Sequence, residues 1–184
     1  QADIINLAEL RKKYAKQAEA AGGSLTVTAI AVKIAAAALR KFPQFNASVD
    51  MEASELIVKK YVNVGIAVDT DRGLLVPVIR NADQKNILQI AAELAQLSEK
   101  ARNRKISLEE MQGGTFSISN LGGIGGTFFT PIVNAPEVAI LGISRAAVQP
   151  KFVADGERGP ASGEFVPRTM LPLSCTTRPL LKSL

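Results

Sequence analysis

Apolar residues recur three or four positions apart in three stretches of the chain, residues 4–21, 28–40 and 84–102. This spacing places them along one face of an α-helix, so each stretch is predicted to be helical. The second stretch carries its charges near one edge, and we expect most of its circumference to be buried. Asp83 is predicted to cap the third helix. Residues 107–110 (Ser-Leu-Glu-Glu) have the pattern of a capping box, which predicts one short helical turn.

Alternation of apolar with other side chains predicts strands elsewhere. Residues 61–69 alternate, residues 70–73 have the composition of a turn, and residues 74–80 return, which together predict a β-hairpin. Pro77 lies in the returning strand and has no N–H to donate. That strand is therefore expected at a sheet edge or at a bulge.

Further strands are predicted at residues 115–119, 138–148 and 166–174, with a polar hairpin loop at residues 155–163. Helices and strands alternate in part, but hairpins dominate. The pattern predicts an α/β fold of the α+β type, with a mixed sheet and helices packed on one side. A single domain over residues 1–184 is expected from the length and from the lack of a linker or an internal repeat.

The composition narrows the functional classes. The chain has 22 Lys and Arg against 17 Asp and Glu, a net charge of +5, but these residues are spread along the sequence and aromatic residues are scarce. Nucleic-acid binding is therefore not expected. No apolar run approaches the roughly 20 residues of a membrane-spanning helix, so no membrane association is expected either. A single cysteine, Cys175, fits a soluble protein in a reducing intracellular compartment.

The sequence contains no histidine. Histidine general bases, histidine-containing catalytic triads and histidine metal ligands are thereby excluded in the chain as written. One cysteine also excludes a cluster of thiolate ligands, so no metal site is expected.

Residues 115–136 (TFSISNLGGIGGTFFTPIVNAP) are the stretch with the clearest chemical potential. An alternating strand delivers the hydroxyls of Ser117 and Ser119 next to a glycine-rich loop, and an apolar, proline-stiffened segment follows. Clustered glycines indicate unusual backbone conformations or close approach of another group. The pattern predicts a substrate channel. A phosphate-binding loop is not predicted, because no Lys-Ser/Thr follows the glycines and no helix begins after them.

Long segments of the sequence resemble a known family. They are YVNVGIAVDTDRGLLVPVIRNAD, GGTFSISNLGGIGGTFFTPIVNAPEVAILGISR and RTMLPLS. In order and without large gaps, residues 3–174 are similar to the catalytic core of the 2-oxoacid dehydrogenase complex acyltransferases. The similarity favours the acetyl-transferring members, those of pyruvate dehydrogenase complexes, over succinyl or branched-chain acyltransferases.

The resemblance implies a two-layer, chloramphenicol-acetyltransferase-like fold and a homotrimer with active sites between subunits. Trimers of the family can assemble into larger hollow cores and bind lipoyl domains and other subunits of the dehydrogenase complex. The implied reaction moves an acetyl group between a dihydrolipoyl thiol and coenzyme A, so acetyl-CoA and lipoyl-lysine are substrates and no tightly bound cofactor is expected. The implied compartment is the bacterial cytoplasm or the mitochondrial matrix.

The resemblance also implies roles for individual residues. Ser119 falls at the position of the serine whose hydroxyl stabilises the tetrahedral oxyanion in the family. Without the resemblance, a strand hydroxyl satisfied by a neighbouring backbone group would be the preferred interpretation of this serine. The channel would be lined by residues that trimer packing could also explain, namely Gly122, Gly125, Gly126, Phe129, Pro131, Ile132 and Asn134.

The sequence departs from the family pattern after residues 171–174. The family continues there into a Tyr-Asp-His-Arg motif whose histidine takes the thiol proton, and this histidine should fall near Pro179. Residues 175–184 (CTTRPLLKSL) are unrelated to that motif, and the family's opening helix and strand precede Gln1, so the domain is interpreted as truncated at both ends. Cys175 is a conceivable substitute base, or simply a small residue near a strand end. We expect this chain to be catalytically inactive, with a structural core subunit as the alternative role.

Overall fold

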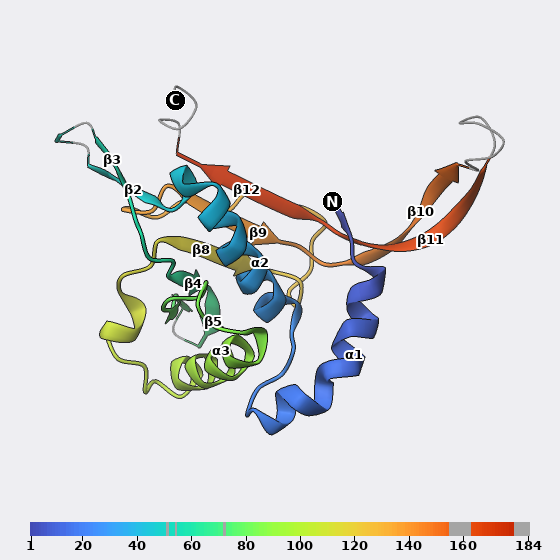
Figure 1. Ribbon diagram of the computed structural model, residues 1–184, viewed down its shortest axis with the longest axis horizontal. Coiled ribbons are helices and arrows are strands. Elements are labelled where there is room, and N and C mark those ends of the chain that lie inside the picture. Colours follow the sequence, from blue (N-terminus) through green and yellow to red (C-terminus); the bar gives the residue numbers. More distant parts are fainter. Residues whose placement is uncertain (51, 54, 72, 155–162, 179–184) are drawn as a thin grey trace.

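The computed structural model describes residues 1–178 except residues 51, 54, 72 and 155–162, and a mixed sheet is the frame of its fold (Figure 1). Within the described residues this sheet has five strands in the order β12-β9-β8-β4-β7. The inner strands are parallel to one another and the two edge strands are antiparallel to their neighbours. The predicted mixed sheet is confirmed. Its strands are β4 (Val64–Ile66), β7 (Val78–Ile79), β8 (Phe116–Asn120), β9 (Ala139–Ile143) and β12 (Leu173–Thr177).

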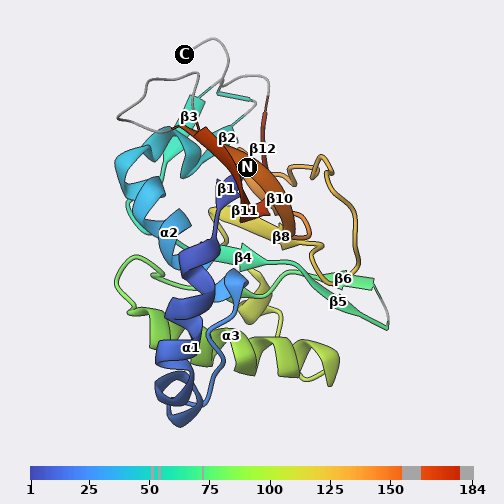
Figure 2. The ribbon, with the colours of Figure 1, turned by 90° about the vertical axis from the view of Figure 1, so that its right-hand side faces the viewer.

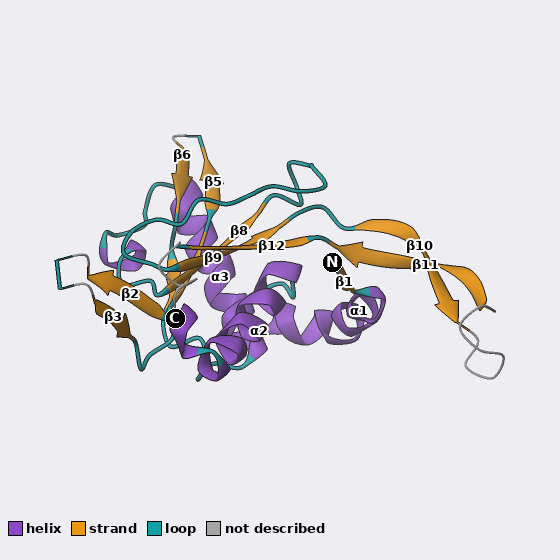
Figure 3. Ribbon diagram, turned by 90° about the horizontal axis from the view of Figure 1, so that it is seen from above, coloured by secondary structure: helices purple, strands orange, loops and turns teal. Residues whose placement is uncertain are grey.

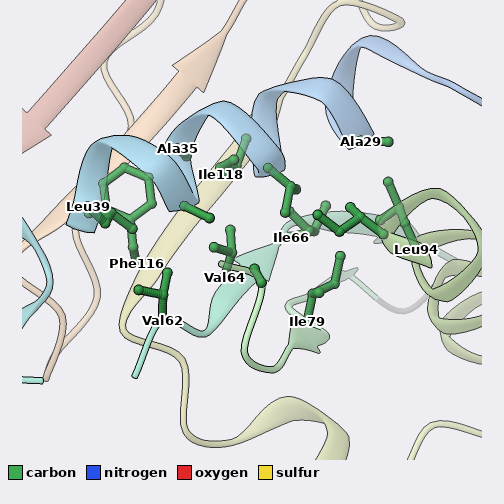
Figure 4. Packing of buried hydrophobic residues seen from close by; sticks show 14 of the residues in the cluster. Ala29, Ala35, Leu39, Val62, Val64, Ile66, Ile79, Leu94, Phe116 and Ile118 are labelled. Atoms are coloured by element: carbon green, nitrogen blue, oxygen red, sulfur yellow. The ribbon is translucent and has the colours of Figure 1, made fainter. Parts of the chain in front are cut away.

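Helices cover one face of this sheet, as predicted. The helices are α1 (Ile5–Ala20), α2 (Val27–Lys41) and α3 (Ile87–Arg102). Figure 2 shows α1 and α2 on one side and the loop after β8 on the other, with α3 crossing below the sheet. Phe116 and Ile118 of β8 point toward α2 and are buried in the main apolar cluster with Leu39 and Leu94 (Figure 4). The alternation in β8 therefore turns its serines away from the helices.

The residues that cap the helices agree only in part with the prediction. Thr26 caps α2 by accepting a hydrogen bond from the N–H of Ala29. The predicted Asp83 cap is wrong, because α3 begins three residues later than predicted and Asn86 forms a capping box with Gln89. The predicted capping box at residues 107–110 is confirmed, and the 3-10 helix η2 (Glu109–Met111) follows.

Several predicted strands are divided in the structure. Residues 61–80 form the expected hairpin, but each of its two strands is divided. β4 pairs with β7 at the base of the hairpin, and β5 (Val68–Thr70) pairs with β6 (Gly73–Leu75) at its tip. The returning strand is interrupted at residues 76–77, which include Pro77, and β7 lies at the sheet edge, as predicted. An antiparallel pair that the sequence pattern did not predict is formed by β2 (Ala47–Asp50) and β3 (Glu55–Val58).

The predicted strands at 138–148 and 166–174 also divide, because the chain passes from one sheet to another. β9 ends at Ile143 and β10 (Ala147–Ala154) begins a second sheet, which β11 (Gly163–Leu171) and β1 (Ala2–Asp3) complete within the described residues. β10 and β11 form an arm that projects from the body (Figures 1 and 3). Most of the hairpin loop predicted at residues 155–163 lies outside the described residues.

The prediction that α2 is buried around most of its circumference holds only in part. Its face toward the sheet and α3 is buried, and it includes Ala29, Val32 and Ala36. On another face Ile34 is 64% exposed, and Phe42, which directly follows the helix, is 47% exposed. An apolar side of this helix is therefore open in the described chain.

Candidate active site

Ser119 lies near the carboxyl end of β8, a central strand with parallel neighbours. Phe116 and Ile118 of the same strand point into the core, so Ser119 points to the face of the sheet opposite the helices. Its side chain is half-buried, and within the described part of the chain its hydroxyl makes no hydrogen bond. The hydroxyl is thus free to donate to a ligand, and it is not satisfied by a neighbouring backbone group. The carboxyl ends of parallel strands are a common place for a binding site in α/β sheets.

An apolar wall stands directly beside Ser119. Gly142 of β9 pairs with Ser119 in the sheet. A Cβ atom added to Gly142 would lie 2.8 Å from Cζ of Phe129 and 3.2 Å from Cδ of Pro131. Because these two side chains pack onto the bare backbone of Gly142, two of the predicted channel residues lie next to the hydroxyl.

Asn120, which sequence analysis did not select, fixes the start of the glycine loop. Its Oδ1 accepts a hydrogen bond of 2.8 Å from the N–H of Gly122, and its Nδ2 donates one of 2.9 Å to Oγ1 of Thr28. The loop is thereby tied to the first turn of α2. A Cβ at Gly122 would lie 3.0 Å from Asn120 Oδ1, so a side chain there would disturb this bond.

Arg145 holds the same loop from the other side. Its Nε donates to the carbonyl of Gly122 at 3.2 Å, and its Nη2 to that of Gly123 at 3.4 Å. Its own N–H donates to the carbonyl of Gly126. Gly125 and Gly126 adopt φ values of +118° and +92°, conformations that favour glycine. The position of Arg145 just after a buried strand was the available signal for a role near the site.

The last two predicted channel residues lie farther along the loop. The side chain of Ile132 is 82% exposed, and Asn134 is exposed and accepts a hydrogen bond of 3.0 Å at its carbonyl from the N–H of Glu137. The structure does not bring either of them together with Ser119 as it does Phe129 and Pro131. Their role as channel lining stays a prediction.

Glu137 is a partly buried carboxyl on the same face as Ser119. Burial raises its pKa above the ordinary value of 4.5, and a hydrogen bond from the hydroxyl of Ser117 opposes part of that rise. A Cβ atom added to Gly114 would lie only 2.8 Å from Oε1 of Glu137. The carboxyl therefore anchors the end of the loop against the beginning of β8.

A cavity of about 490 Å³ adjoins the glycine loop. Its lining includes Asn120, Gly123 and Ile124 of the loop and the oppositely charged side chains of Asp69 and Arg102. The rest of the lining mixes the hydroxyl groups of Ser24, Thr26, Thr28 and Ser98 with apolar side chains such as Ile66, Val68 and Leu94.

Cys175 cannot act on the Ser119 face. It lies in β12, paired with Leu141, and lines an apolar groove together with Phe116, which points to the helix side of the sheet. Burial raises the pKa of its thiol, which disfavours the thiolate. The position near Pro179, where the family histidine should fall, lies outside the described residues.

Two further properties of the described residues bear on the site. They contain no cluster of three or more acidic, cysteine or histidine side chains able to bind a metal ion. None of their helices combines the length and hydrophobicity that crossing a bilayer requires.

Comparison with known proteins agrees with the resemblance seen in the sequence. Residues 1–177 match the family model described as 2-oxoacid dehydrogenases acyltransferase (catalytic domain). The dihydrolipoyllysine-residue acetyltransferase component of the pyruvate dehydrogenase complex from Azotobacter vinelandii is 55% identical over 173 residues. This alignment covers 94% of the chain but only 26% of that protein.

Solved structures give the same result for the fold. A structure of Azotobacter vinelandii dihydrolipoamide acetyltransferase aligns with a TM-score of 0.87 and 54% identity, covering 96% of this chain and 69% of that one. Its description concerns a serine, a histidine and an asparagine in the catalytic mechanism. The cubic core of the pyruvate dehydrogenase multienzyme complex aligns equally well, with a TM-score of 0.87, 53% identity and the same coverage.

Chloramphenicol acetyltransferase aligns with a TM-score of 0.50 and 15% identity over 90% of this chain and 72% of its own. At this identity the likeness concerns the fold alone. The predicted chloramphenicol-acetyltransferase-like fold is thereby confirmed.

Proposed function

Because the chain belongs to the acyltransferase family of the 2-oxoacid dehydrogenases and matches its catalytic domain, we propose that residues 1–184 form one acyltransferase core domain. The proposed type is dihydrolipoyllysine-residue acetyltransferase of a pyruvate dehydrogenase complex. Its substrates are coenzyme A or acetyl-CoA and a lipoyl-lysine thiol, with no tightly bound cofactor. This polypeptide provides the site but does not itself turn over.

The acetyl assignment is supported by the relatives. The Azotobacter vinelandii and Pseudomonas aeruginosa proteins, 55% and 54% identical, are both named as acetyltransferase components of pyruvate dehydrogenase complexes. The chain spans less than a third of either protein, so the activity of those longer proteins comes to it as a proposal. Succinyl or branched-chain acyl transfer, which other members of the family carry out, is the alternative within the same chemistry.

The free hydroxyl of Ser119 beside the Phe129–Pro131 wall is the observation that carries the proposal. When a thiolate attacks the thioester carbon, negative charge develops on the carbonyl oxygen. A hydroxyl already oriented toward that oxygen stabilises the transition state, and loss of one such donor typically lowers the rate by about 10²–10³. The apolar wall keeps water from competing for the thioester.

The chain lacks a general base that could accept the proton of the attacking thiol. A thiol with a pKa near 8.5 is mostly protonated at neutral pH, so attack needs a group that accepts its proton. A histidine takes part in the catalytic mechanism described for the solved Azotobacter vinelandii relative, whereas this sequence contains no histidine. Cys175 lies on the other face of the sheet with a raised pKa, so it does not substitute. The consequence is substrate binding without efficient transfer.

The β5–β6 hairpin and the loop after β8 have the character of an interface. The exposed apolar side chains of Leu74, Ile124, Phe128 and Ile132 lie on the β5–β6 hairpin and on the loop after β8. Such exposure supports contact with further copies, and we assign the chain to a homotrimer in which Gly122, Gly125, Gly126, Ile132 and Asn134 line a channel between subunits. Trimers could then join a larger core, as in the cubic core of the solved relative. Lipoyl domains and other dehydrogenase-complex subunits are the proposed partners, in a bacterial cytoplasm or mitochondrial matrix.

A structural role is the second candidate, and the lack of histidine favours it. A subunit that trimerises without turnover would contribute only to assembly. The two candidates differ in whether the site still binds substrate, because a purely structural subunit needs no intact channel.

The test measures coenzyme A binding by calorimetry and acetyl transfer from acetyl-CoA to dihydrolipoamide. We expect saturable binding that Phe129→Ala weakens, and transfer no faster than without protein. Turnover at the rate of the Azotobacter vinelandii relative would contradict the proposed inactivity. Transfer at background together with no binding would leave only the structural role.

A further inference from the structure

Asn120 is the last residue of β8 and directly follows Ser119. Strand alternation places its side chain on the face opposite to the Ser119 hydroxyl, the face from which Ile118 points toward α2 (Figure 4). The side-chain amide bonds at both ends: Oδ1 accepts from the N–H of Gly122 at 2.8 Å, and Nδ2 donates to Oγ1 of Thr28 at 2.9 Å. It therefore joins the start of the glycine loop to a helix residue 92 positions earlier in the chain.

The sheet supports this end of β8 on one side only. β4 pairs with β8 as far as Ile118. β9 continues further, and its Gly142 pairs with Ser119. Among the described residues, Ser119 and Asn120 thus have a paired neighbouring strand on one side alone. The hydrogen bond from Asn120 to α2 supplies a second point of attachment where the ladder to β4 has ended.

Thr28 is a fixed point for that attachment. It lies in the first turn of α2, whose N-cap Thr26 accepts a hydrogen bond of 3.1 Å from the N–H of Ala29. Ala29 and Ile30, which follow Thr28, are buried, so this turn is packed into the body of the protein. A side chain on a packed and capped helical turn can hold a partner within a narrow range of positions.

We propose that Asn120 is a positioning residue for acyl transfer and that it acts through Thr28. Its two hydrogen bonds fix the end of β8 and the first residues of the glycine loop relative to α2, and they thereby keep the neighbouring Ser119 hydroxyl in the orientation that transfer needs. An amide suits this place because the side chain has to accept at one end and donate at the other. The inference rests on the proposed function, since Ser119 is the group that is positioned.

Small displacements of Ser119 are enough to matter. An oxyanion donor is effective when it lies about 2.7–3.1 Å from the oxygen on which charge develops. A misplacement of about 1 Å, even from a change outside the site, can lower a rate by as much as about 10²-fold. Loss of the tie between Asn120 and Thr28 should therefore reduce the rate of transfer without removing any group that contacts the substrate.

The experiment breaks the contact from the Thr28 side. Thr28→Val keeps the shape of the side chain and removes the hydroxyl that accepts from Asn120, whereas Thr28→Ser retains a hydroxyl. Thr169→Val is the matched control. It makes the same change at another half-buried threonine, in β11 of the second sheet, whose hydroxyl bonds no other described residue. Circular dichroism checks that all variants fold.

Amide hydrogen exchange over residues 121–126 measures the loop directly. Thr28→Val is expected to speed this exchange about three- to tenfold, the effect of losing one hydrogen bond of ordinary strength. Thr28→Ser and Thr169→Val should stay within about twofold of the unmodified chain.

Acetyl transfer from acetyl-CoA to dihydrolipoamide, with free imidazole supplied as the base, measures the consequence for Ser119. At saturating acetyl-CoA, Thr28→Val should lower the imidazole-dependent rate per folded molecule at least about threefold, while the half-saturating concentration of acetyl-CoA stays within about twofold. Thr28→Ser should restore the rate. A merely structural contact would reduce the amount of folded protein and leave the rate per folded molecule unchanged.

A double substitution shows whether Asn120 acts through Thr28. Asn120→Ala alone should impair both measurements at least as much as Thr28→Val does. Adding Thr28→Val to Asn120→Ala should change them by less than about a further twofold, because the contact is already lost. Independent, multiplying effects of the two substitutions would overturn the proposal.

The proposal is also overturned if Thr28→Val leaves the exchange of residues 121–126 unchanged, or if exchange rises while the imidazole-dependent rate of Thr28→Val equals that of the unmodified chain. An unmodified chain without any imidazole-dependent transfer would instead contradict the proposed function. The exchange measurements do not use acetyl transfer, so they decide in that case whether Asn120 holds the loop through Thr28.

Discussion

Replacing Gly142 with alanine tests the packing that places an apolar wall beside Ser119. A Cβ at position 142 would lie 2.8 Å from Cζ of Phe129, 3.1 Å from its Cε1 and 3.2 Å from Cδ of Pro131. Carbon atoms in contact are ordinarily about 3.5–4.0 Å apart. The Phe129 ring therefore has to move by about 0.7 Å or more, and Pro131 by less.

The size of the effect follows from two opposing contributions. Forcing an additional methyl group into packed surroundings costs about 1–3 kcal/mol. Alanine also restricts the unfolded chain, which stabilises a protein by about 0.4–1 kcal/mol where the backbone accepts it. We expect Gly142→Ala to lower the free energy of unfolding by about 1–2 kcal/mol in urea titrations followed by circular dichroism. Coenzyme A affinity should fall in parallel, because the displaced ring lies beside the proposed site.

Gly123→Ala is the matched control. It lies in the neighbouring glycine loop, no atom comes within 4 Å of a Cβ built there, and its φ is not in the left-handed region. Its free energy of unfolding is expected to stay within about 0.5 kcal/mol of the unmodified chain. If Gly142→Ala proves as stable as Gly123→Ala, Phe129 and Pro131 do not pack on β9, and the reasoning that places the wall beside Ser119 is refuted.

Three other substitutions address single contacts. Arg145→Ala removes two hydrogen bonds to the glycine loop and should cost about 1 kcal/mol while speeding limited proteolysis at residues 121–137; unchanged cleavage would show that the loop does not depend on it. Glu137→Gln should alter the pH dependence of unfolding. Burial raises the pKa of this carboxyl from 4.5, so the unmodified chain should lose stability relative to the variant as pH rises through 4.5 toward the higher folded pKa, and parallel pH profiles would contradict that burial. Ser119→Ala should leave the free energy of unfolding within about 0.5 kcal/mol, because the described residues give its hydroxyl no hydrogen bond; a loss above 1 kcal/mol would indicate a structural hydroxyl.

Helices and strands whose apolar residues recur at a regular spacing were predictable from the sequence. The spacing of apolar residues in α1, α2 and α3 and the alternation in β8 depend on local geometry alone, and the structure follows them. The alternation also predicted that Ser119 leaves the core while Ile118 enters it. Assigning a chemical role to Ser119 required the family resemblance, because alternation does not distinguish a catalytic hydroxyl from a solvated one.

The predictions of the α3 cap and of two undivided strands were wrong because tertiary contacts determine these features, and a local sequence pattern does not record such contacts. Asp83 and Asn86 are both competent caps, and the choice depends on tertiary packing: Lys33 donates to the carbonyls of Asp83 and Lys85 and holds that segment in place. The strands at 138–148 and 166–174 divide where the chain crosses between sheets.

Asn120 and Arg145 were missed for a related reason. Both act on the glycine loop through contacts between residues distant in sequence, such as Asn120 with Thr28 and Arg145 with Gly122. Gly142 was open to prediction, because a glycine between Leu141 and Ile143 in a buried strand indicates close approach of another group.

Chemical rescue tests the central claim, that the site retains its oxyanion donor and lacks only a base. Acetyl transfer from acetyl-CoA to dihydrolipoamide is measured with and without free imidazole, for the unmodified chain and for Ser119→Ala. We predict transfer at background without imidazole, and an imidazole-dependent rate that Ser119→Ala lowers by about 10²–10³. Equal imidazole-dependent rates in the two proteins, or full turnover by the unmodified chain without imidazole, would contradict the account.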